Sequence, residues 1–238
     1  MSTPYGFEIT NDCSSCKRRA QGFFCNLSPS ATKDLGAVRS TAVYPAGAVL
    51  FLENQDPHGV FLLCAGKVKL SINSSEGKTL ITRLVDPGEI LGLTAVFSGT
   101  PYEVTAETMH PSLVAFIRRE DFLRLMNKHP EIYQAAIRQL SLLYRGACEQ
   151  LRTIGLSTSA PEKVARLLLH FSPVRPDDRL VSSTTLPLTH EEIASCIAST
   201  RETVTRTLSD FKAKRLVAFR GSSFTIENRE ALESLGSL

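Results

Sequence analysis

Three cysteines lie within the first 25 residues of this 238-residue chain, at a spacing that suits metal ligation or thiol chemistry. Cys13 and Cys16 form a C-x2-C pair, and Cys25 follows after eight further residues. Thiolates bind metals and are also the reactive species in disulfide and peroxide chemistry. The basic run from Lys17 to Arg19 favours that charged form. The segment therefore predicts a metal centre or a thiol sensor, with a purely structural role as the third interpretation.

The other three cysteines, Cys64, Cys148 and Cys196, stand singly within apolar stretches. A small residue of the hydrophobic core is the ordinary interpretation of such a cysteine. Because the chain lacks a secretory signal, we expect all six thiols to be reduced rather than paired in disulfides.

A second set of residues, near the C-terminus, is suited to contacts with nucleic-acid bases. Arg201, Glu202, Thr205 and Arg206 recur at the spacing of one exposed helix face. An arginine can donate two hydrogen bonds to guanine, and a carboxylate can accept one from cytosine. Hydroxyl groups near helix starts suit phosphate oxygens. Three threonines meet that description: Thr189, Thr200 and Thr203.

Two short amphipathic helices joined by a tight turn would position these side chains. Thr189, followed by Glu192 three residues later, fits a capping box at the start of the first helix. Ser199 or Thr200 caps the second helix. This spacing predicts a helix-turn-helix, whose second helix enters the major groove of double-stranded DNA.

Charge is concentrated in the same region. Six basic residues and two acidic ones lie between Ser199 and Arg220, whereas the whole chain has a formal net charge of only +3. Clustering of basic residues, rather than their total, is typical of a DNA-binding surface. Residues 216–226 then predict two strands around a Gly-Ser turn, which would complete a winged helix.

Short apolar runs separated by glycine-containing turns occupy residues 38–117. Many short strands at near-regular spacing predict a closed barrel or jelly roll. Asp121 is then expected to cap a short helix that stops before Pro130. Metal-dependent enzymes of this architecture need clustered ligands, but the barrel segment offers His58 and His110 without an H-x-H pair. We therefore expect no enzyme activity.

From Pro130 to about Gly155, apolar residues recur every three or four positions, which predicts one long amphipathic helix. We expect its apolar stripe to pair with the same helix of a second subunit, since two-fold dimers are the commonest oligomers. Packing of the stripe on its own barrel is the alternative. The stripe comprises Ile132, Ala136, Leu140, Leu143, Ala147, Leu151 and Ile154.

These elements predict an α+β chain in four parts. Residues 1–29 form a cysteine-containing segment, 30–129 a sensor barrel, 130–156 a dimerisation helix and 157–238 a winged helix-turn-helix domain. The composition, with 42% hydrophobic and 21% charged residues, is that of a soluble globular protein. Without a bilayer-spanning apolar run or a signal peptide, we expect a cytoplasmic protein that does not contact membranes.

Nearly the whole chain resembles the catabolite-activator and fumarate–nitrate-regulator (CRP/FNR) superfamily. Residues 199–206 resemble its recognition-helix signature, and residues 64–68 and 87–92 resemble segments of its cyclic-nucleotide-binding-like jelly roll. The resemblance implies a homodimeric transcription regulator that acts with RNA polymerase on a palindromic site with TGTGA-like half-sites. It also implies base contacts by Arg201, Glu202 and Arg206, and phosphate contacts by Thr189 and Thr203.

The resemblance does not extend to the residues that bind cyclic AMP. Leu93 follows Gly92 where the relatives that bind this ligand have a glutamate, and residues 99–105 contain no arginine for the cyclic phosphate. A buried phosphate would lack a counter-charge. Cyclic AMP is therefore not the expected ligand. Another small molecule in the barrel, or a cyclic-nucleotide module that does not bind DNA, remains an alternative.

The N-terminal cysteines resemble those of oxygen-sensing family members, which hold a 4Fe-4S cluster. Their spacing differs, however, and the fourth ligand of those members matches Ala115 here. The fourth ligand would then be Cys64, Cys148, Asp12 or a non-protein group. Oxygen or redox sensing through a cluster is the main expectation, and zinc or a thiol switch is the alternative.

Overall fold

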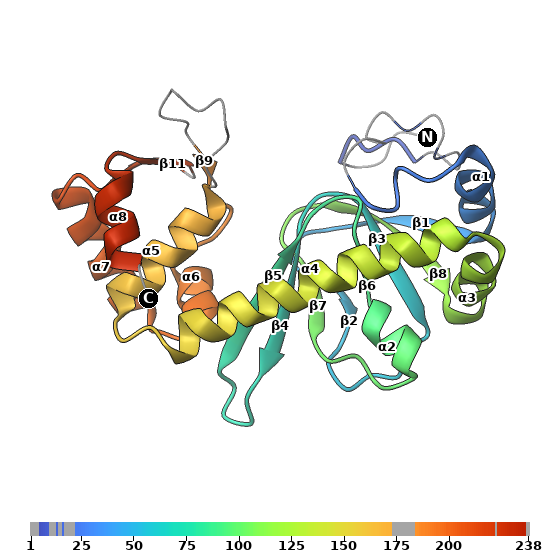
Figure 1. Ribbon diagram of the computed structural model, residues 1–238, viewed down its shortest axis with the longest axis horizontal. Coiled ribbons are helices and arrows are strands. Elements are labelled where there is room, and N and C mark those ends of the chain that lie inside the picture. Colours follow the sequence, from blue (N-terminus) through green and yellow to red (C-terminus); the bar gives the residue numbers. More distant parts are fainter. Residues whose placement is uncertain are drawn as a thin grey trace. The chain divides into compact units, whose positions relative to one another are not determined.

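The computed structural model describes residues 5–9, 13, 16, 22–172, 184–221 and 223–236. Asp12 and the basic run from Lys17 to Arg19 lie outside the described residues. The chain divides into two compact units, Met1–Gly146 and Ala147–Leu238 (Figure 1). The boundary between the two units falls inside the long helix α4 (Pro130–Gly155).

Two four-stranded antiparallel sheets form the barrel of the first unit, with strand orders β1-β8-β3-β6 and β2-β7-β4-β5. They confirm the predicted jelly roll, which Figure 1 shows beside α4. The strands are β1 (Arg39–Tyr44), β2 (Val49–Phe51), β3 (Gly59–Ala65), β4 (Val68–Asn73), β5 (Thr79–Val85), β6 (Ile90–Leu91), β7 (Thr105–Thr108) and β8 (Ser112–Arg118).

Strand β3 is buried on both faces, because it separates two hydrophobic cores. Successive side chains of a strand point to opposite faces. Phe61 and Leu63 therefore join an inner core between the two sheets, whereas Val60 and Leu62 join an outer core on the far face. Strand β8 alternates in the same way. The barrel wall is thus held by apolar burial from both sides.

Four helices and the N-terminal segment contribute to the outer core. Helix α1 (Pro29–Val38) begins with Ser28 as its cap and a proline in its first turn, an arrangement that suits a helix start. Helix α3 (Arg119–Lys128) and the first half of α4 complete the layer, and Phe24 and Leu27 pack beneath them. The short helix α2 (Leu93–Ser98) follows β6 and adds Leu93 and Val96 to the same core. The sequence analysis missed α1 and α2.

The expectation that Asp121 caps α3 is wrong. The helix begins at Arg119, and the side chain of its cap residue Arg118 makes no capping hydrogen bond. Asp121 lies inside the first turn, where its carboxylate forms ion pairs with Arg118 and Arg124. An acidic residue is favourable at that place because it faces the positive end of the helix dipole. The predicted end before Pro130 is confirmed.

Helix α4 confirms the predicted long helix, but its apolar residues lie on two faces rather than one. Ile132, Ala135 and Ala136 are buried in the outer core, so the start of the helix packs on its own barrel. A different set of α4 residues alternates at spacings of four and three, and several of its large side chains are exposed. We call this set the α4 seam; it comprises Tyr133, Ile137, Leu140, Tyr144, Ala147, Leu151 and Ile154. Leu140 lies at its edge, because it also packs against the outer core.

Gln139 connects α4 to the barrel through hydrogen bonds. Its side chain is 1% exposed and faces the backbone of Ile90 in β6. The Ile90 N–H donates to Oε1 at 2.9 Å, and Nε2 donates to the Ile90 carbonyl at 2.6 Å. One amide side chain therefore satisfies both backbone groups of a buried strand residue.

Replacing Gln139 with Leu should lower the free energy of unfolding of the first unit by about 2 to 4 kcal/mol, because two buried backbone groups lose their partners. All five tyrosines of the chain fall within residues 1–146. Urea unfolding followed by tyrosine fluorescence therefore reports on this unit alone. Gln134→Leu, an exposed position on the same helix, is the control. Equal stability of the two variants would contradict the role given to Gln139.

The second unit contains the predicted winged helix-turn-helix. Ser159 caps α5 as expected, accepting a hydrogen bond from the Glu162 N–H. The wing is a three-stranded sheet of order β10-β11-β9, one strand more than predicted, and a further helix, α8, follows it. The elements are α5 (Ala160–Phe171), β9 (Thr184–Thr185), α6 (His190–Ile197), α7 (Arg201–Ala213), β10 (Val217–Arg220), β11 (Ser223–Ile226) and α8 (Arg229–Gly236).

Candidate nucleic-acid interface and thiol cluster

The helix-turn-helix is built from α6, a three-residue turn and α7. The Glu192 N–H donates to Thr189 Oγ1 at 3.2 Å, and the Thr189 N–H donates to Glu192 Oε2 at 2.9 Å. This reciprocal pair confirms the predicted capping box. Ala198 ends α6 in the left-handed conformation, with φ of 51°, and lets the chain turn sharply into α7. Of the two predicted caps for α7, Thr200 is the one used.

Helix α7 separates its polar and apolar residues by face. Val204, Thr207, Leu208 and Phe211 are buried. The four residues predicted to read bases, Arg201, Glu202, Thr205 and Arg206, are all exposed in its first two turns. The two guanidinium groups and the carboxylate therefore stand at the end of the helix that a recognition helix inserts into the major groove.

The hydroxyl groups predicted to contact phosphates already have partners within the helix starts. Thr189 Oγ1 donates to Glu192 Oε2 at 3.0 Å. The hydroxyls of Thr200 and Thr203 lie 2.9 Å apart, and Thr200 also accepts from the Thr203 N–H at 3.2 Å. Since a phosphate oxygen needs a donor, Thr189 must turn its hydroxyl away from Glu192 before it can bind DNA, whereas in the Thr200–Thr203 pair one hydroxyl accepts and keeps its proton available.

Thr205 differs from the other predicted base-reading residues. Its hydroxyl donates to the Arg201 carbonyl at 2.9 Å and lies 2.8 Å from His190 Nδ1. The side chain therefore links α7 to the first residue of α6. The sequence analysis missed His190, because residues 15 positions apart share no periodic signal.

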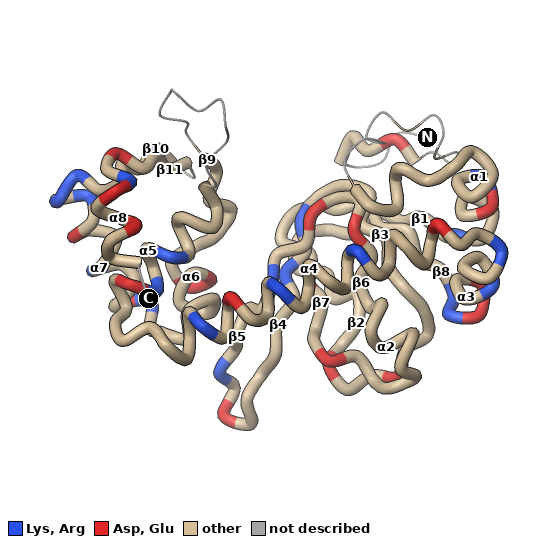
Figure 2. The backbone as a smooth tube through the Cα atoms, in the orientation of Figure 1, with Lys and Arg blue, Asp and Glu red and all other residues tan. Residues whose placement is uncertain are grey.

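Basic side chains continue beyond the tip of α7. Lys212, Lys214, Arg215 and Arg220 are exposed, and Figure 2 marks the basic and acidic positions of this unit. Asp210 partly offsets them by pairing with Lys214, whose Nζ lies 2.8 Å from Oδ2. These cations can add sequence-independent attraction to a phosphate backbone.

In the first unit, the three N-terminal cysteines lie on two short turns. The Cys16 N–H donates to the Cys13 carbonyl at 3.3 Å, and the Cys25 N–H donates to the Gly22 carbonyl at 3.2 Å. Arg39, at the start of β1, donates from Nη1 to Cys13 Sγ at 2.7 Å. A guanidinium in contact with sulfur favours the thiolate.

Cys64, on β3, belongs to the same neighbourhood. Burial raises the pKa of its thiol to about 12; the charge of Arg39 opposes this rise, and the thiols of Cys13, Cys16 and Cys25 add to it. Cys64 therefore lies within the electrostatic surroundings of Arg39 and of the three N-terminal cysteines. Nothing local in the sequence indicates this, because Cys64 lies 39 positions after Cys25.

The two remaining cysteines lie elsewhere. Cys148 is half-buried on α4 and belongs to the second unit. Cys196 is buried in α6, and burial raises the pKa of its thiol to about 12. A thiol in that state is inert, as expected of a small core residue.

Two protein families match this arrangement. Residues 41–129 match the cyclic nucleotide-binding domain, and residues 162–235 match the Crp-like helix-turn-helix domain. The chain belongs to the CRP/FNR family. Members of this family are transcription regulators that bind DNA through the helix-turn-helix, and they are not enzymes.

Relatives of this CRP/FNR protein match it over most of its length. The CRP-like cAMP-activated global transcriptional regulator of Mycobacterium tuberculosis is 26% identical over 212 residues, covering 89% of this chain and 94% of the relative. The fumarate and nitrate reduction regulatory protein of Shigella dysenteriae is also 26% identical, covering 79% and 75% of the two chains. The fold is similar to that of FixK2 from Bradyrhizobium japonicum, with a TM-score of 0.72, 23% identity and coverage of 84% of this chain and 98% of that one.

Aromatic side chains occupy the barrel interior of this CRP/FNR protein. The rings of Phe51 and Tyr102 stack with centroids 4.0 Å apart, and Phe61 lies 5.5 Å from Phe51. The Tyr102 hydroxyl donates to the Gly59 carbonyl at 2.7 Å. These three aromatic residues belong to the inner core between the two sheets. Leu93, which follows Gly92, is buried in the outer core instead.

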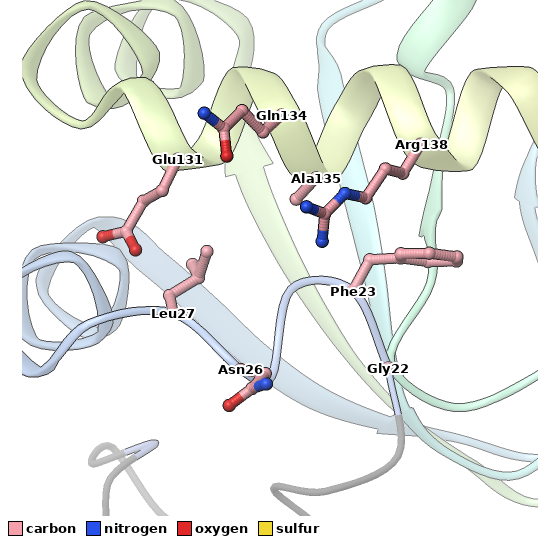
Figure 3. A pocket seen from close by; sticks show the side chains of 8 residues that line it. All are labelled: Gly22, Phe23, Asn26, Leu27, Glu131, Gln134, Ala135 and Arg138. Carbon is pink, nitrogen blue, oxygen red and sulfur yellow. The ribbon is translucent and has the colours of Figure 1, made fainter.

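The segment that carries Cys25 also contacts α4 across a shallow pocket of about 440 Å³ (Figure 3). Glu131 accepts hydrogen bonds there from the Ser28 N–H at 3.1 Å and from the Ser28 hydroxyl at 2.5 Å. Figure 3 shows Arg138 extending from α4 toward Phe23. These hydrogen bonds therefore connect the segment that follows Cys25 in this CRP/FNR protein to the start of α4.

Among the residues that the structure describes, no three His, Cys, Asp or Glu side chains are already placed around a point that could hold one metal ion. The cysteines nevertheless supply the donor type that iron–sulfur clusters require. None of the described helices combines the length and the apolar character needed to cross a membrane.

Proposed function

We propose that this CRP/FNR regulator acts in the cytoplasm as a homodimer that reads a palindromic DNA site through two copies of α7. The observation that carries this proposal is the exposed face of α7, with Arg201, Glu202 and Arg206 at its start and a buried apolar face behind them. Long side chains on a rigid, capped helix can reach base edges at defined positions. RNA polymerase is the protein partner that such a regulator implies.

The phosphate contacts would come from the helix starts and the basic residues beyond α7. Thr189, Thr200 and Thr203 can donate to phosphate oxygens, Thr189 once its hydroxyl turns from Glu192. His190 stands beside Thr189 at the start of α6 and is exposed, so it adds a fourth polar group at that edge. Thr205 would contribute by holding the two helices together as well as by facing the groove.

The α4 seam supports pairing with a second subunit. Tyr144 and Leu151 are 75% and 70% exposed, although both belong to an alternation of four and three residues. That repeat matches the spacing of side chains that interlock between two parallel helices. A two-fold pair would present two copies of α7 to half-sites one helical turn apart on the duplex.

The signal that we propose is oxygen or redox state, received by an iron–sulfur cluster on the N-terminal cysteines. Cys13, Cys16 and Cys25 would supply thiolates, and Arg39 would offset the negative charge they bring. When bound, the cluster would be the group that reacts with oxygen.

A salt titration tests DNA binding directly. Affinity for a duplex should fall roughly 10³-fold from about 50 to about 200 mM salt, because each subunit's cations displace counterions from phosphates. Lys212→Ala should reduce the slope of this dependence, whereas Lys78→Ala, an exposed lysine in the β4–β5 turn, should leave it unchanged. A loss below about ten-fold, or equal slopes for the two variants, would contradict the proposed interface.

A further inference from the structure

We propose that His190 makes DNA binding dependent on pH, because its protonated ring donates to a DNA phosphate while Thr205 holds the ring in place. His190 is the first residue of α6 and is exposed at the edge of the helix-turn-helix. The inference rests on the proposed function, since it specifies how one polar group of that interface meets a phosphate oxygen. It adds a second signal, the proton, which acts on the DNA-binding unit directly.

The two contacts of the Thr205 hydroxyl determine which ring nitrogen of His190 carries a hydrogen. The hydroxyl donates its one hydrogen to the Arg201 carbonyl at 2.9 Å, because a carbonyl oxygen can only accept. The same hydroxyl oxygen lies 2.8 Å from His190 Nδ1, so it must accept the hydrogen of this second bond. Nδ1 is therefore the nitrogen that carries the hydrogen when the ring is neutral.

This arrangement prevents the neutral ring from donating to a phosphate. A neutral imidazole has one hydrogen, so Nε2 is an acceptor while Nδ1 donates to Thr205. Because a phosphate oxygen also accepts, the neutral ring could bind it only by giving up the bond to Thr205. The protonated ring keeps that bond and donates from Nε2 as well. Its charge strengthens the contact, since charge-assisted hydrogen bonds are roughly twice as strong as neutral ones.

The place of His190 in the unit suits a phosphate contact. Its neighbour in the chain is Thr189, the cap of α6 that we expect to contact a phosphate. Thr205, its partner on α7, lies between Arg201 and Arg206 on the exposed face of that helix. The ring therefore stands beside the residues proposed to enter the major groove, at the edge where the DNA backbone would pass.

Charged side chains near the ring come from the two helices that hold it. On α6 they are Glu191 and Glu192, and on α7 they are Arg201, Glu202 and Arg206. Carboxylates favour the protonated ring and guanidinium groups oppose it. Both kinds of group ordinarily keep their charge from about pH 6 to about pH 8, whereas histidine ordinarily changes its charge in this range. A change in affinity over this range therefore reports on a histidine.

Binding and protonation are linked, so each favours the other. A phosphate binds the protonated ring better than the neutral one, and affinity should therefore increase as the pH falls. A dimer brings two copies of His190 to the duplex. The effect is expected on duplexes of any sequence, since contacts to phosphates do not distinguish bases.

Affinity for a random-sequence duplex, measured by fluorescence anisotropy at constant salt concentration, tests the inference. Wild-type protein should bind about ten-fold or more tightly at about pH 6 than at about pH 8, because each subunit gains a charge-assisted hydrogen bond. His190→Gln should bind weakly, with little dependence on pH. The matched control is His170→Gln, which removes an exposed histidine of α5 and should keep the wild-type dependence. Equal dependence in the two variants would overturn the inference.

Two further variants test the charge and the role of Thr205. His190→Arg has a permanent charge and should bind tightly at every pH, which a protein that failed to fold could not do. Thr205→Val leaves Nδ1 without its acceptor, so the neutral ring can carry its hydrogen on Nε2. Binding at about pH 8 should then strengthen and the pH dependence should shrink. Wild-type dependence in Thr205→Val would overturn the role given to Thr205.

Failure of this inference and failure of the proposed function give different results. Wild-type protein that binds no duplex at any pH would overturn the proposed DNA interface as a whole. Tight binding whose strength does not change with pH would overturn the inference about His190 and leave the interface standing.

Discussion

Replacing Leu151 with Asp should convert the dimer to a monomer and reduce affinity for a palindromic duplex by about 100-fold or more. Leu151 is 70% exposed and lies in the α4 seam, where a partner helix would bury it. A carboxylate at that place would lose its hydration without gaining a counter-charge. Two half-sites bound by one dimer gain about 10²- to 10⁴-fold in affinity, and separate monomers lose that gain.

Leu142→Asp is the matched control. It makes the same substitution on the same helix, at a residue that is 46% exposed but lies outside the seam. Sedimentation and duplex binding should show this variant to be dimeric and close to wild type. If both variants remain dimeric, subunits do not pair through the seam; if both become monomeric, the interface is wider than the seam.

The DNA-binding half could be predicted from sequence because its determinants are local. A capping box needs two residues three positions apart, and Thr189 with Glu192 supplies it. The faces of α7 follow from helical periodicity alone, so Arg201 and Arg206 were correctly expected on its exposed side. The short apolar runs that form β3 and β8 likewise predicted strands, although not that two cores would bury both faces.

Features that depend on contacts between distant segments were missed or only partly predicted. Apolar spacing on α4 indicated a helix, but it could not separate Ile132, which packs on the barrel, from Ile137, which does not. The prediction that Asp121 caps α3 was wrong for a related reason, since an aspartate is favourable both before a helix and within its first turn. The close approach of Gly22 to Gly88, whose N–H donates to Leu63 of β3, joins segments that no short window contains.

Replacing Arg206 with Ala should lower affinity for the specific site by about 1 to 3 kcal/mol in each half-site, and by much less on random duplex. The guanidinium is exposed on α7 one turn after Glu202, so both can face the same groove. A bidentate arginine contact to guanine discriminates among bases, whereas a phosphate contact does not. Comparing the loss of affinity on the specific duplex with that on random duplex therefore distinguishes a base contact from a phosphate contact.

The site itself can be obtained by selecting bound duplexes from a random library, with enrichment of TGTGA-like half-sites as the expected result. Lys212→Ala is the matched control, because Lys212 is exposed on the same helix beyond the tip. It should weaken binding to both duplexes alike, as loss of a phosphate contact does. If Arg206→Ala behaves in the same way, Arg206 contacts the DNA phosphate backbone, and discrimination among bases must come from Arg201 and Glu202.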